Sequence, residues 1–255
     1  MKFSIQNPAR IVMLGAGGTG SYVAMHLYRL AHCLDRHVRI IIADGDSVEQ
    51  KNLVRQHFTV SDLGTNKAKA LAERYAGAFM MKAEYIPDFI EEKERLNELV
   101  RAEHVPGEKG TLAPTKEIPI LLGCVDNNKT RRLCDEVFYE SENLVYIDAG
   151  NGEHTGQVVC GVRSKGRTLY KPIGAAYPDV LEDTDKFPSE LSCAEASVSA
   201  PQTIAANMTA ATVMVGLLYN ILVLGDNKIK SASFSTKTMN VQPVTETKRK
   251  HRNEA

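Results

Sequence analysis

Apolar runs and helical patterns alternate through the first 150 residues of the chain. Runs such as 39–43 and 118–122 are apolar at almost every position, and a strand with no polar side is typical of the centre of a parallel sheet whose two faces are covered by helices. The pattern therefore predicts a doubly wound α/β sheet. It has strands at 10–14, 38–43, 82–86, 118–125 and 144–148 and helices at 19–34, 66–79, 89–103 and 127–141.

After residue 148 the pattern changes. Apolar and polar residues alternate over 155–162 and 229–241, with a long apolar helix expected over about 201–224, which predicts an antiparallel C-terminal extension of a mostly parallel sheet. The interval of about 163–192 is rich in Gly, Pro, Asp and Glu and is predicted to be a mobile loop, and 106–116 a shorter surface loop. We expect one domain over 1–244 and a disordered basic tail over 245–255.

Composition restricts the location and partners of the protein. Its 255 residues suit one large α/β domain, and 31 Lys and Arg balance 31 Asp and Glu, so nothing attracts it generally to nucleic acid or anionic membranes. There is no apolar core of a signal peptide, and the apolar run 210–224 is shorter than the ~20 residues of a membrane span. None of the five cysteines forms a Cys-x-x-Cys pair, which argues against disulfides and zinc. We expect a cytoplasmic protein without zinc.

A glycine-rich turn follows the first predicted strand, in the sequence Ile-Val-Met-Leu-Gly-Ala-Gly-Gly-Thr-Gly at 11–20. Gly15 permits the tight turn, Gly17 and Gly18 let phosphates approach bare backbone, and Gly20 lets the next helix sit close on the strand. The N-terminus of that helix offers N–H groups and a partial positive charge to an anion. The motif predicts a phosphate cradle in a Rossmann-like fold, but enzymes that use NAD, flavins or ATP share it.

The polar residues after the second strand distinguish between these ligands. Asp44, at the end of that strand, suits ribose hydroxyls and serves NAD and ATP equally well. Asp46, Asn52 and Arg55 follow, and a nicotinamide site has little use for such groups. Arg55 can bind phosphate oxygens in a forked geometry and Asn52 can donate to them, so this segment favours a triphosphate.

Two further residues extend the same hypothesis. Lys67 lies in the first turn of a predicted helix, within reach of a phosphate, and Asp126 lies at the carboxyl end of the strand 118–125, where it would hold Mg²⁺. Each position has a plain structural alternative: Asp126 as a helix cap, Arg55 and Lys67 as surface charges, Asp46 as a turn residue. Their joint position around one glycine turn favours the nucleotide site.

Five motifs together resemble one family. They are Gly-x-Gly-Gly-x-Gly-Ser ending at Ser21, Asp-x-Asp at 44–46, Asn-Leu-x-Arg-Gln at 52–56, Gly-x-x-Lys at 64–67 and Asp-Asn-x-x-x-Arg at 126–131. With them, residues 10–243 resemble the ThiF/MoeB/HesA superfamily of ubiquitin-activating-enzyme-like adenylating domains. The resemblance implies an adenylyltransferase that uses Mg-ATP. We expect the nucleotide site to comprise Gly15, Gly17, Gly18, Gly20, Asp44, Asp46, Asn52, Arg55, Gln56, Lys67, Asp126 and Asn127, with Mg²⁺ on Asp126.

The same resemblance implies the substrate and a candidate nucleophile. In the family, the C-terminal carboxylate of a small β-grasp, ubiquitin-like protein attacks the α-phosphate, which gives an acyl adenylate and pyrophosphate. Cys193, in Ser-Cys-Ala-Glu-Ala-Ser-Val at 192–198, is similar to a family cysteine that accepts the acyl group, and exposure beside a helix N-terminus would favour its thiolate. The alternative is a small residue packed at a loop–helix junction. We expect Asp126, Arg55, Lys67 and Cys193 to be the catalytic residues.

The resemblance is strongest to the ThiF-family proteins of the plasmid-associated PRTRC system, which implies a partner with a C-terminal glycine, a conjugating-enzyme-like protein and a homodimer. An arginine that dimeric members supply across the interface has no clear counterpart, because Arg10 lies too near the first strand. Alternatives remain: adenylation of a small molecule, peptide or tRNA base, a catalytically silent binding module for a ubiquitin-like protein, or a nicotinamide dehydrogenase, which would leave Asn52, Arg55 and Lys67 unexplained.

Overall fold

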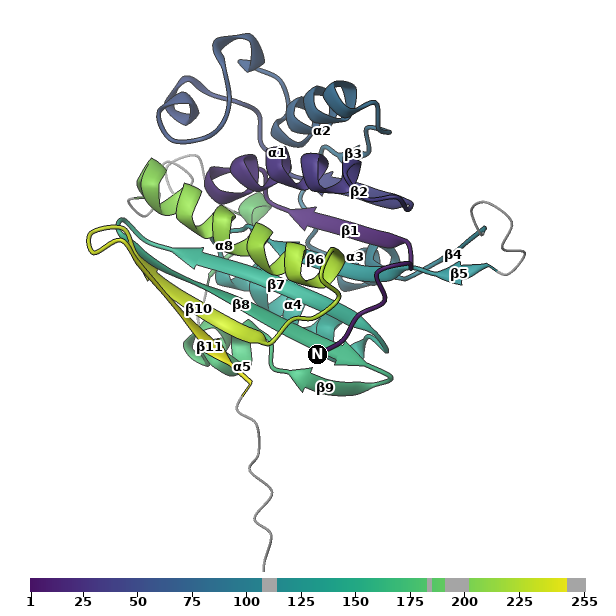
Figure 1. The fold of residues 1–255 in the computed structure, drawn as a ribbon. Helices are drawn as coiled ribbons and strands as arrows, with labels where there is room; N and C mark the ends of the chain where they lie inside the picture. Colours follow the sequence, from purple (N-terminus) through teal and green to yellow (C-terminus); the bar gives the residue numbers. More distant parts are fainter. Residues whose placement is uncertain (107–113, 183–184, 191–201, 247–255) are drawn as a thin grey trace, which may run out of the picture.

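The computed structural model describes residues 1–106, 114–182, 185–190 and 202–246, and its centre is a nine-stranded mixed sheet (Figure 1). The strand order is β11-β10-β8-β7-β6-β1-β2-β3, with β9 paired to β8. The first half of the chain supplies a parallel set, which confirms the predicted architecture. Its strands are β1 (Ala9–Leu14), β2 (Val38–Ala43), β3 (Tyr85–Ile86), β6 (Ile118–Gly123) and β7 (Leu144–Asn151).

The antiparallel extension is also confirmed. β8 (Thr155–Ser164) returns along β7, β10 (Ile229–Ser235) pairs with β8, and β11 (Asn240–Thr245) closes this side of the sheet. The hairpin between β7 and β8 keeps one continuous register, from Leu144 opposite Arg163 to Asn151 opposite Gly156. Its turn lies beside the carboxyl ends of β1 and β6, so the extension contributes to the same edge of the sheet as the parallel strands.

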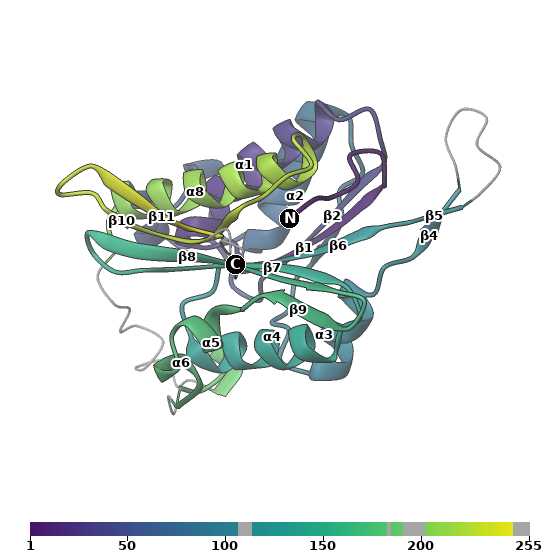
Figure 2. The same ribbon diagram turned by 60° about the horizontal axis from the view of Figure 1, so that its bottom comes forward.

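Helices cover both faces of the sheet (Figure 2). One layer consists of α1 (Gly18–His32), α2 (Lys67–Phe79) and α8 (Ile204–Leu222), and the other of α3 (Lys93–Val100) and α4 (Asn128–Glu140) with two short helices. Alternate residues of β1 explain the apolar run 11–14: Ile11 and Met13 belong to the first core cluster, Val12 and Leu14 to the second. Both faces of the strand are buried over this run, so no position in it favours a polar side chain.

Helix α8 is apolar enough and long enough to cross a membrane by length and composition. In the structure it packs against α1 and against strands β7, β8 and β10. One polar residue, Asn207, lies fully buried in its first turns. A buried amide needs hydrogen-bond partners, and those of Asn207 lie at the functional site described below.

Two predicted loops contain short regular elements. The ends of the 106–116 loop lie beside the ribbon of β4 (His104–Val105) and β5 (Thr115–Lys116), which projects from the body (Figure 2). The interval 163–192 contains elements of three or four residues, too short to show periodicity. They are β9 (Arg167–Tyr170), α5 (Ile173–Ala176), α6 (Asp179–Glu182) and the 3-10 turn η3 (Pro188–Glu190). Thr245, assigned to the tail, ends β11.

Candidate functional site

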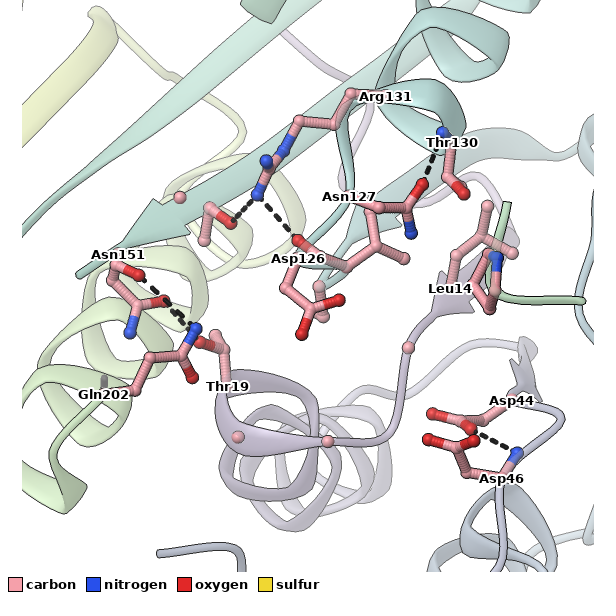
Figure 3. Close-up of a pocket in the computed structure, with 18 of the residues that line it drawn as sticks. Leu14, Thr19, Asp44, Asp46, Asp126, Asn127, Thr130, Arg131, Asn151 and Gln202 are labelled. Atoms are coloured by element: carbon pink, nitrogen blue, oxygen red, sulfur yellow. Dashed lines mark hydrogen bonds between the residues drawn. The ribbon is translucent and has the colours of Figure 1, made fainter. Parts of the chain in front are cut away.

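A pocket of about 660 Å³ opens at the carboxyl ends of β1, β2, β6 and β7 (Figure 3). Its volume is typical of a site for a small ligand. Most of the residues predicted from the sequence line it together: Gly15, Gly17, Gly18, Asp44, Asp46, Asn52, Arg55, Gln56, Lys67, Asp126 and Asn127. Gly20 lies behind the wall of the pocket, and Cys193 lies outside the described residues.

The glycine turn is shaped by close backbone approaches. Gly15 has φ +89°, and a Cβ there would lie 2.6 Å from the Cys124 carbonyl oxygen. A Cβ at Gly20 would lie 2.0 Å from the carbonyl oxygen of Gly15, which explains why α1 can follow the strand so tightly. Gly17 is the N-cap of α1 and leaves ordinary space, with Gln56 Nε2 3.8 Å away. The first N–H groups of a helix have no partner within it, so this end of α1 suits an anion.

These glycines make separable predictions. We expect Gly20→Ala to lower the free energy of unfolding by about 1 to 3 kcal/mol or more, because the methyl group overlaps backbone. Gly17→Ala should fold normally and weaken ATP binding, because its methyl group lies where a phosphate would approach. Urea unfolding and calorimetric titration with ATP would measure both effects. Equal losses of stability in the two variants would contradict this division of roles.

Gly18 lines the pocket and also makes room for two protein side chains. A Cβ at Gly18 would lie within 2.9 Å of Arg55 Nη1 and within 2.8 Å of both polar atoms of the Asn207 amide. The space that this glycine leaves is therefore occupied by protein groups. The sequence motif shows only that a small residue is needed at position 18. The side chain that lies against it, Asn207, belongs to α8, nearly 190 residues later in the chain.

Asp44 fixes the turn against β2. Its Oδ2 accepts the Ala16 N–H at 2.6 Å and its Oδ1 accepts the Asp46 N–H at 2.8 Å. Burial raises the pKa of Asp44, and the Lys67 ammonium opposes that rise. Carboxylate oxygens have further lone pairs for a ribose hydroxyl, so the structural contacts of Asp44 are compatible with the role expected from the sequence.

Lys67 and Asp46 form an ion pair. Lys67, in the first turn of α2, is 8% exposed in its side chain and donates from Nζ to Asp46 Oδ2 at 2.7 Å, whereas Asp46 is 54% exposed. Lys67 is therefore not one of the free surface charges that the alternative interpretation required. The pair places a largely buried ammonium, with an exposed partner, at the side of the pocket near Asp44.

Asn52 and Gln56 belong to the segment after β2. Asn52 Oδ1 accepts the Glu49 N–H at 2.8 Å in the cap of the 3-10 turn η1 (Gln50–Val54), so its amide nitrogen is the group that remains for a ligand. Gln56 is buried, and its Nε2 faces Gly17. Among the described residues, Gln56 Oε1 has no hydrogen-bond partner, which is costly unless another polar group supplies one.

Asp126 and Asn127 divide two tasks between them. Asn127 caps α4, because its Oδ1 accepts the Thr130 N–H at 2.8 Å. Asp126, one residue earlier, is exposed, and its carboxylate points into the pocket (Figure 3). Asn127, and not Asp126, therefore caps the helix. The Asp126 carboxylate faces the space left for a ligand.

Arg131 is a pocket residue that the sequence analysis did not select as a site residue. Its Nη2 donates to the carbonyl oxygens of Val125 at 2.6 Å and Ala149 at 3.2 Å, and its Nε donates to Asp148 Oδ1 at 3.1 Å. The guanidinium thereby ties the segment before Asp126 to strand β7. Its Nη1 also donates to Asn128 Oδ1 at 2.9 Å, and an arginine with this many fixed acceptors holds its neighbours in one geometry.

Asp148 is the buried partner of this arginine. It is fully buried, and its Oδ2 accepts the Tyr146 hydroxyl at 2.8 Å. Burial raises the pKa of Asp148, and the Arg131 guanidinium and the Tyr146 hydroxyl oppose the rise. A Cβ on Gly123, its partner in β6, would lie 2.1 Å from Asp148 Oδ2. An acidic residue inside an apolar strand was the signal in the sequence that could have identified it.

The end of β7 and the start of α8 supply a further wall that the sequence analysis missed. Asn151 at the end of β7, Gln202 and Asn207 meet Thr19 of α1 there in a network of amide and hydroxyl groups. Arg10, by contrast, is buried at the opposite end of β1, where its Nε lies 2.7 Å from Glu117 Oε2. Arg10 takes no part in the pocket.

The model of the ThiF family matches residues 5–255, and solved structures share the fold. PaaA has a TM-score of 0.63 at 16% identity, over 94% of this chain and 64% of its own. The structure of E. coli MccB with AMPCPP and MccA has a TM-score of 0.63 at 16% identity, and that of E. coli MccB with ATP has a TM-score of 0.61 at 17% identity. Each match covers 93% of this chain and 63% of MccB. This chain thus spans just under two thirds of these proteins. No curated protein matches it significantly.

Proposed function

Because the chain belongs to the ThiF family, we propose that it is an ATP- and Mg²⁺-dependent adenylyltransferase that activates the C-terminal carboxylate of a small ubiquitin-like protein. The observation that supports this most is the convergence of Arg55, Lys67 and Asp126 on one open pocket with the glycine turn. A dinucleotide dehydrogenase has no need of two cations and a metal-binding carboxylate at this place. The fold shared with MccB, of which a structure with ATP exists, agrees with a nucleotide in this pocket.

The residues present fit ATP and magnesium. The turn at Gly17 and the N-terminus of α1 suit phosphate oxygens, and the orphaned Gln56 beside them suits a polar ligand. Asp126 would hold Mg²⁺, which prefers one or two carboxylates together with phosphate oxygens and water. When bound, the metal would offset negative charge on the phosphates.

The proposed reaction needs positioning and electrostatics more than acid–base chemistry. An oxygen of the substrate carboxylate forms a bond to the α-phosphorus, the bond between that phosphorus and the bridging oxygen breaks, and pyrophosphate leaves with the electron pair. The carboxylate is already ionised at neutral pH, so no general base is required. Arg55 and Lys67 stabilise the charge on the phosphates, as preorganised cations do in phosphoryl-type transfers.

Cys193 is proposed as the acceptor for a second step, in which its thiolate displaces AMP from the acyl adenylate to give a thioester. The expected partners are a ubiquitin-like protein that ends in glycine, a conjugating-enzyme-like protein and a second copy of this chain. Intact-mass measurement of the protein with ATP and the ubiquitin-like protein tests the second step. Dithiothreitol should release the adduct from the unaltered protein by thiol exchange, whereas Cys193→Ser should carry either no adduct or an ester that survives the thiol.

Pyrophosphate exchange into ATP tests the first step. The probe is a glycine-ending ubiquitin-like protein from the same cells, compared with the same protein as a C-terminal carboxamide. We expect exchange with the carboxylate form and only background with the carboxamide, because the attacking oxygen is lost. Exchange that is supported by a small carboxylic acid or by tRNA, and not by the protein tail, would establish the alternative substrates instead. Thermal stabilisation by NADH and not by ATP would contradict both.

A further inference from the structure

Arg55 is held by a ring of hydrogen bonds that reaches the first turns of α8. Its Nη1 donates to Gln202 Oε1 at 2.9 Å, and Gln202 Nε2 lies 3.4 Å from the Asn151 carbonyl oxygen. Asn151 Nδ2 donates to Asn207 Oδ1 at 2.8 Å, and Asn207 Nδ2 lies 3.5 Å from the Arg55 carbonyl oxygen, which closes the ring with a long contact. Thr19 of α1 joins through a 3.0 Å bond to Asn151 Oδ1.

The ring places the guanidinium on the glycine turn. A Cβ at Gly18 would meet both Asn207 and Arg55 Nη1 within 2.9 Å, so these two groups lie directly on the backbone of the turn. Asn207 is the polar residue among the buried residues of α8. A buried amide in that position is costly unless its hydrogen bonds are satisfied, and the groups that satisfy them belong to Asn151 and Arg55.

The chemistry of the partner matters as much as its position. Among the described residues, Gln202 is the hydrogen-bond partner of the Arg55 guanidinium. A neutral carbonyl oxygen orients a guanidinium and leaves its charge uncompensated, whereas a carboxylate would form an ion pair and compete with a phosphate. An arginine oriented before the ligand arrives also loses less side-chain entropy when it binds.

We propose that Gln202 is a positioning residue for nucleotide binding: it presents the Arg55 guanidinium to the phosphates over Gly18, with Asn207 and Asn151 as its support. This inference rests on the proposed function, in which Arg55 binds the phosphates of ATP. It assigns to the start of α8, which contributes no charge to the site, a part in the affinity for ATP. Gln202 acts through Arg55 and need not touch the nucleotide.

Calorimetric titration with ATP and MgCl₂ tests the proposal. Gln202→Met keeps the length of the side chain and removes the hydrogen bond, and we expect the Kd for ATP to rise roughly three- to tenfold. Gln202→Glu should raise it further, and added salt should partly reverse that additional loss, because both positions are partly exposed to solvent. In an Arg55→Lys background, Gln202→Met should have little further effect.

Thr203→Ala is the matched control at the same end of α8. Thr203 caps the helix by accepting the Ala206 N–H and does not contact Arg55, so its loss should lower stability without changing the Kd for ATP. An unchanged Kd in Gln202→Met, or an equal loss in the Arg55→Lys background, would overturn the proposal while leaving the proposed function intact. Absence of ATP binding by the unaltered protein would instead overturn the proposed function.

Discussion

Replacing Asp126 with alanine is expected to lower the rate of pyrophosphate exchange by a factor of about 10² to 10³. The expected cause is the loss of the carboxylate that the structure directs into the pocket, one residue before the cap of α4. Loss of a metal ligand changes the metal dependence as well as the rate. The exchange rate of Asp126→Ala should therefore saturate at a much higher MgCl₂ concentration than that of the unaltered protein.

Two further variants test whether the effect of Asp126→Ala comes from the loss of a metal ligand. Asp126→Asn retains the shape and one oxygen ligand and should fall between the unaltered protein and the alanine variant. Asp179→Ala removes another acidic residue that lines the same pocket, from the short helix α6, and should leave the MgCl₂ dependence unchanged. If Asp126→Ala lowered the rate and kept the same MgCl₂ dependence, Asp126 would act on the substrate or on folding and not through a metal.

The second large effect concerns stability. We expect Asp148→Ala to lower the free energy of unfolding by about 3 to 5 kcal/mol, because it leaves the buried Arg131 guanidinium without its counter-charge. Tyr146 would lose its hydroxyl acceptor at the same time. Urea unfolding followed by circular dichroism measures this loss. Asp148→Asn, which keeps the shape and can still accept from Tyr146, should be less harmful.

A double variant separates stability from the geometry of the site. Replacing a buried ion pair by apolar residues of similar volume is often neutral or stabilising, so Arg131→Met with Asp148→Leu should recover much of the stability lost in Asp148→Ala. It should not recover pyrophosphate exchange, because the bonds from Arg131 to the Val125 and Ala149 carbonyls are gone. Full recovery of both would show that Arg131 stabilises the fold and has no effect on the Asp126 segment.

Much of the fold was predictable because its parallel strands are buried on both sides. The predicted strand 38–43 coincides with β2, and the strands 10–14 and 144–148 lie within β1 and β7. The predicted helix 89–103 was too long, since α3 has the bounds Lys93–Val100. Short elements such as β4 and α5 were missed because their segments span only about one period of a strand or helix pattern, too little for the pattern to repeat.

The residues of the site likewise fall into those that could be predicted from the sequence and those that could not. Residues at the ends of parallel strands, such as Asp44 and Asp126, could be predicted because the carboxyl ends of such strands form one edge. Asn151, Gln202 and Asn207 could not, since their approach to Arg55 depends on how an antiparallel hairpin and an apolar helix pack onto that edge. Asn207 gave a weak signal as a polar residue in an apolar helix. Gly18 was identified, but its neighbour was not.

The ring through Thr19, Arg55 and Asn207 also determines when the pocket can be completed during synthesis of the chain. Roughly 150 residues separate Arg55 from Asn207, which a ribosome adds in about 8 to 30 s. During that interval α1 and the segment after β2 have left the ribosome, and the amides that orient the arginine have not yet been synthesised. The parallel half of the protein therefore leaves the ribosome with this side of the pocket open, and the pocket is completed only after the first turns of α8 have been synthesised.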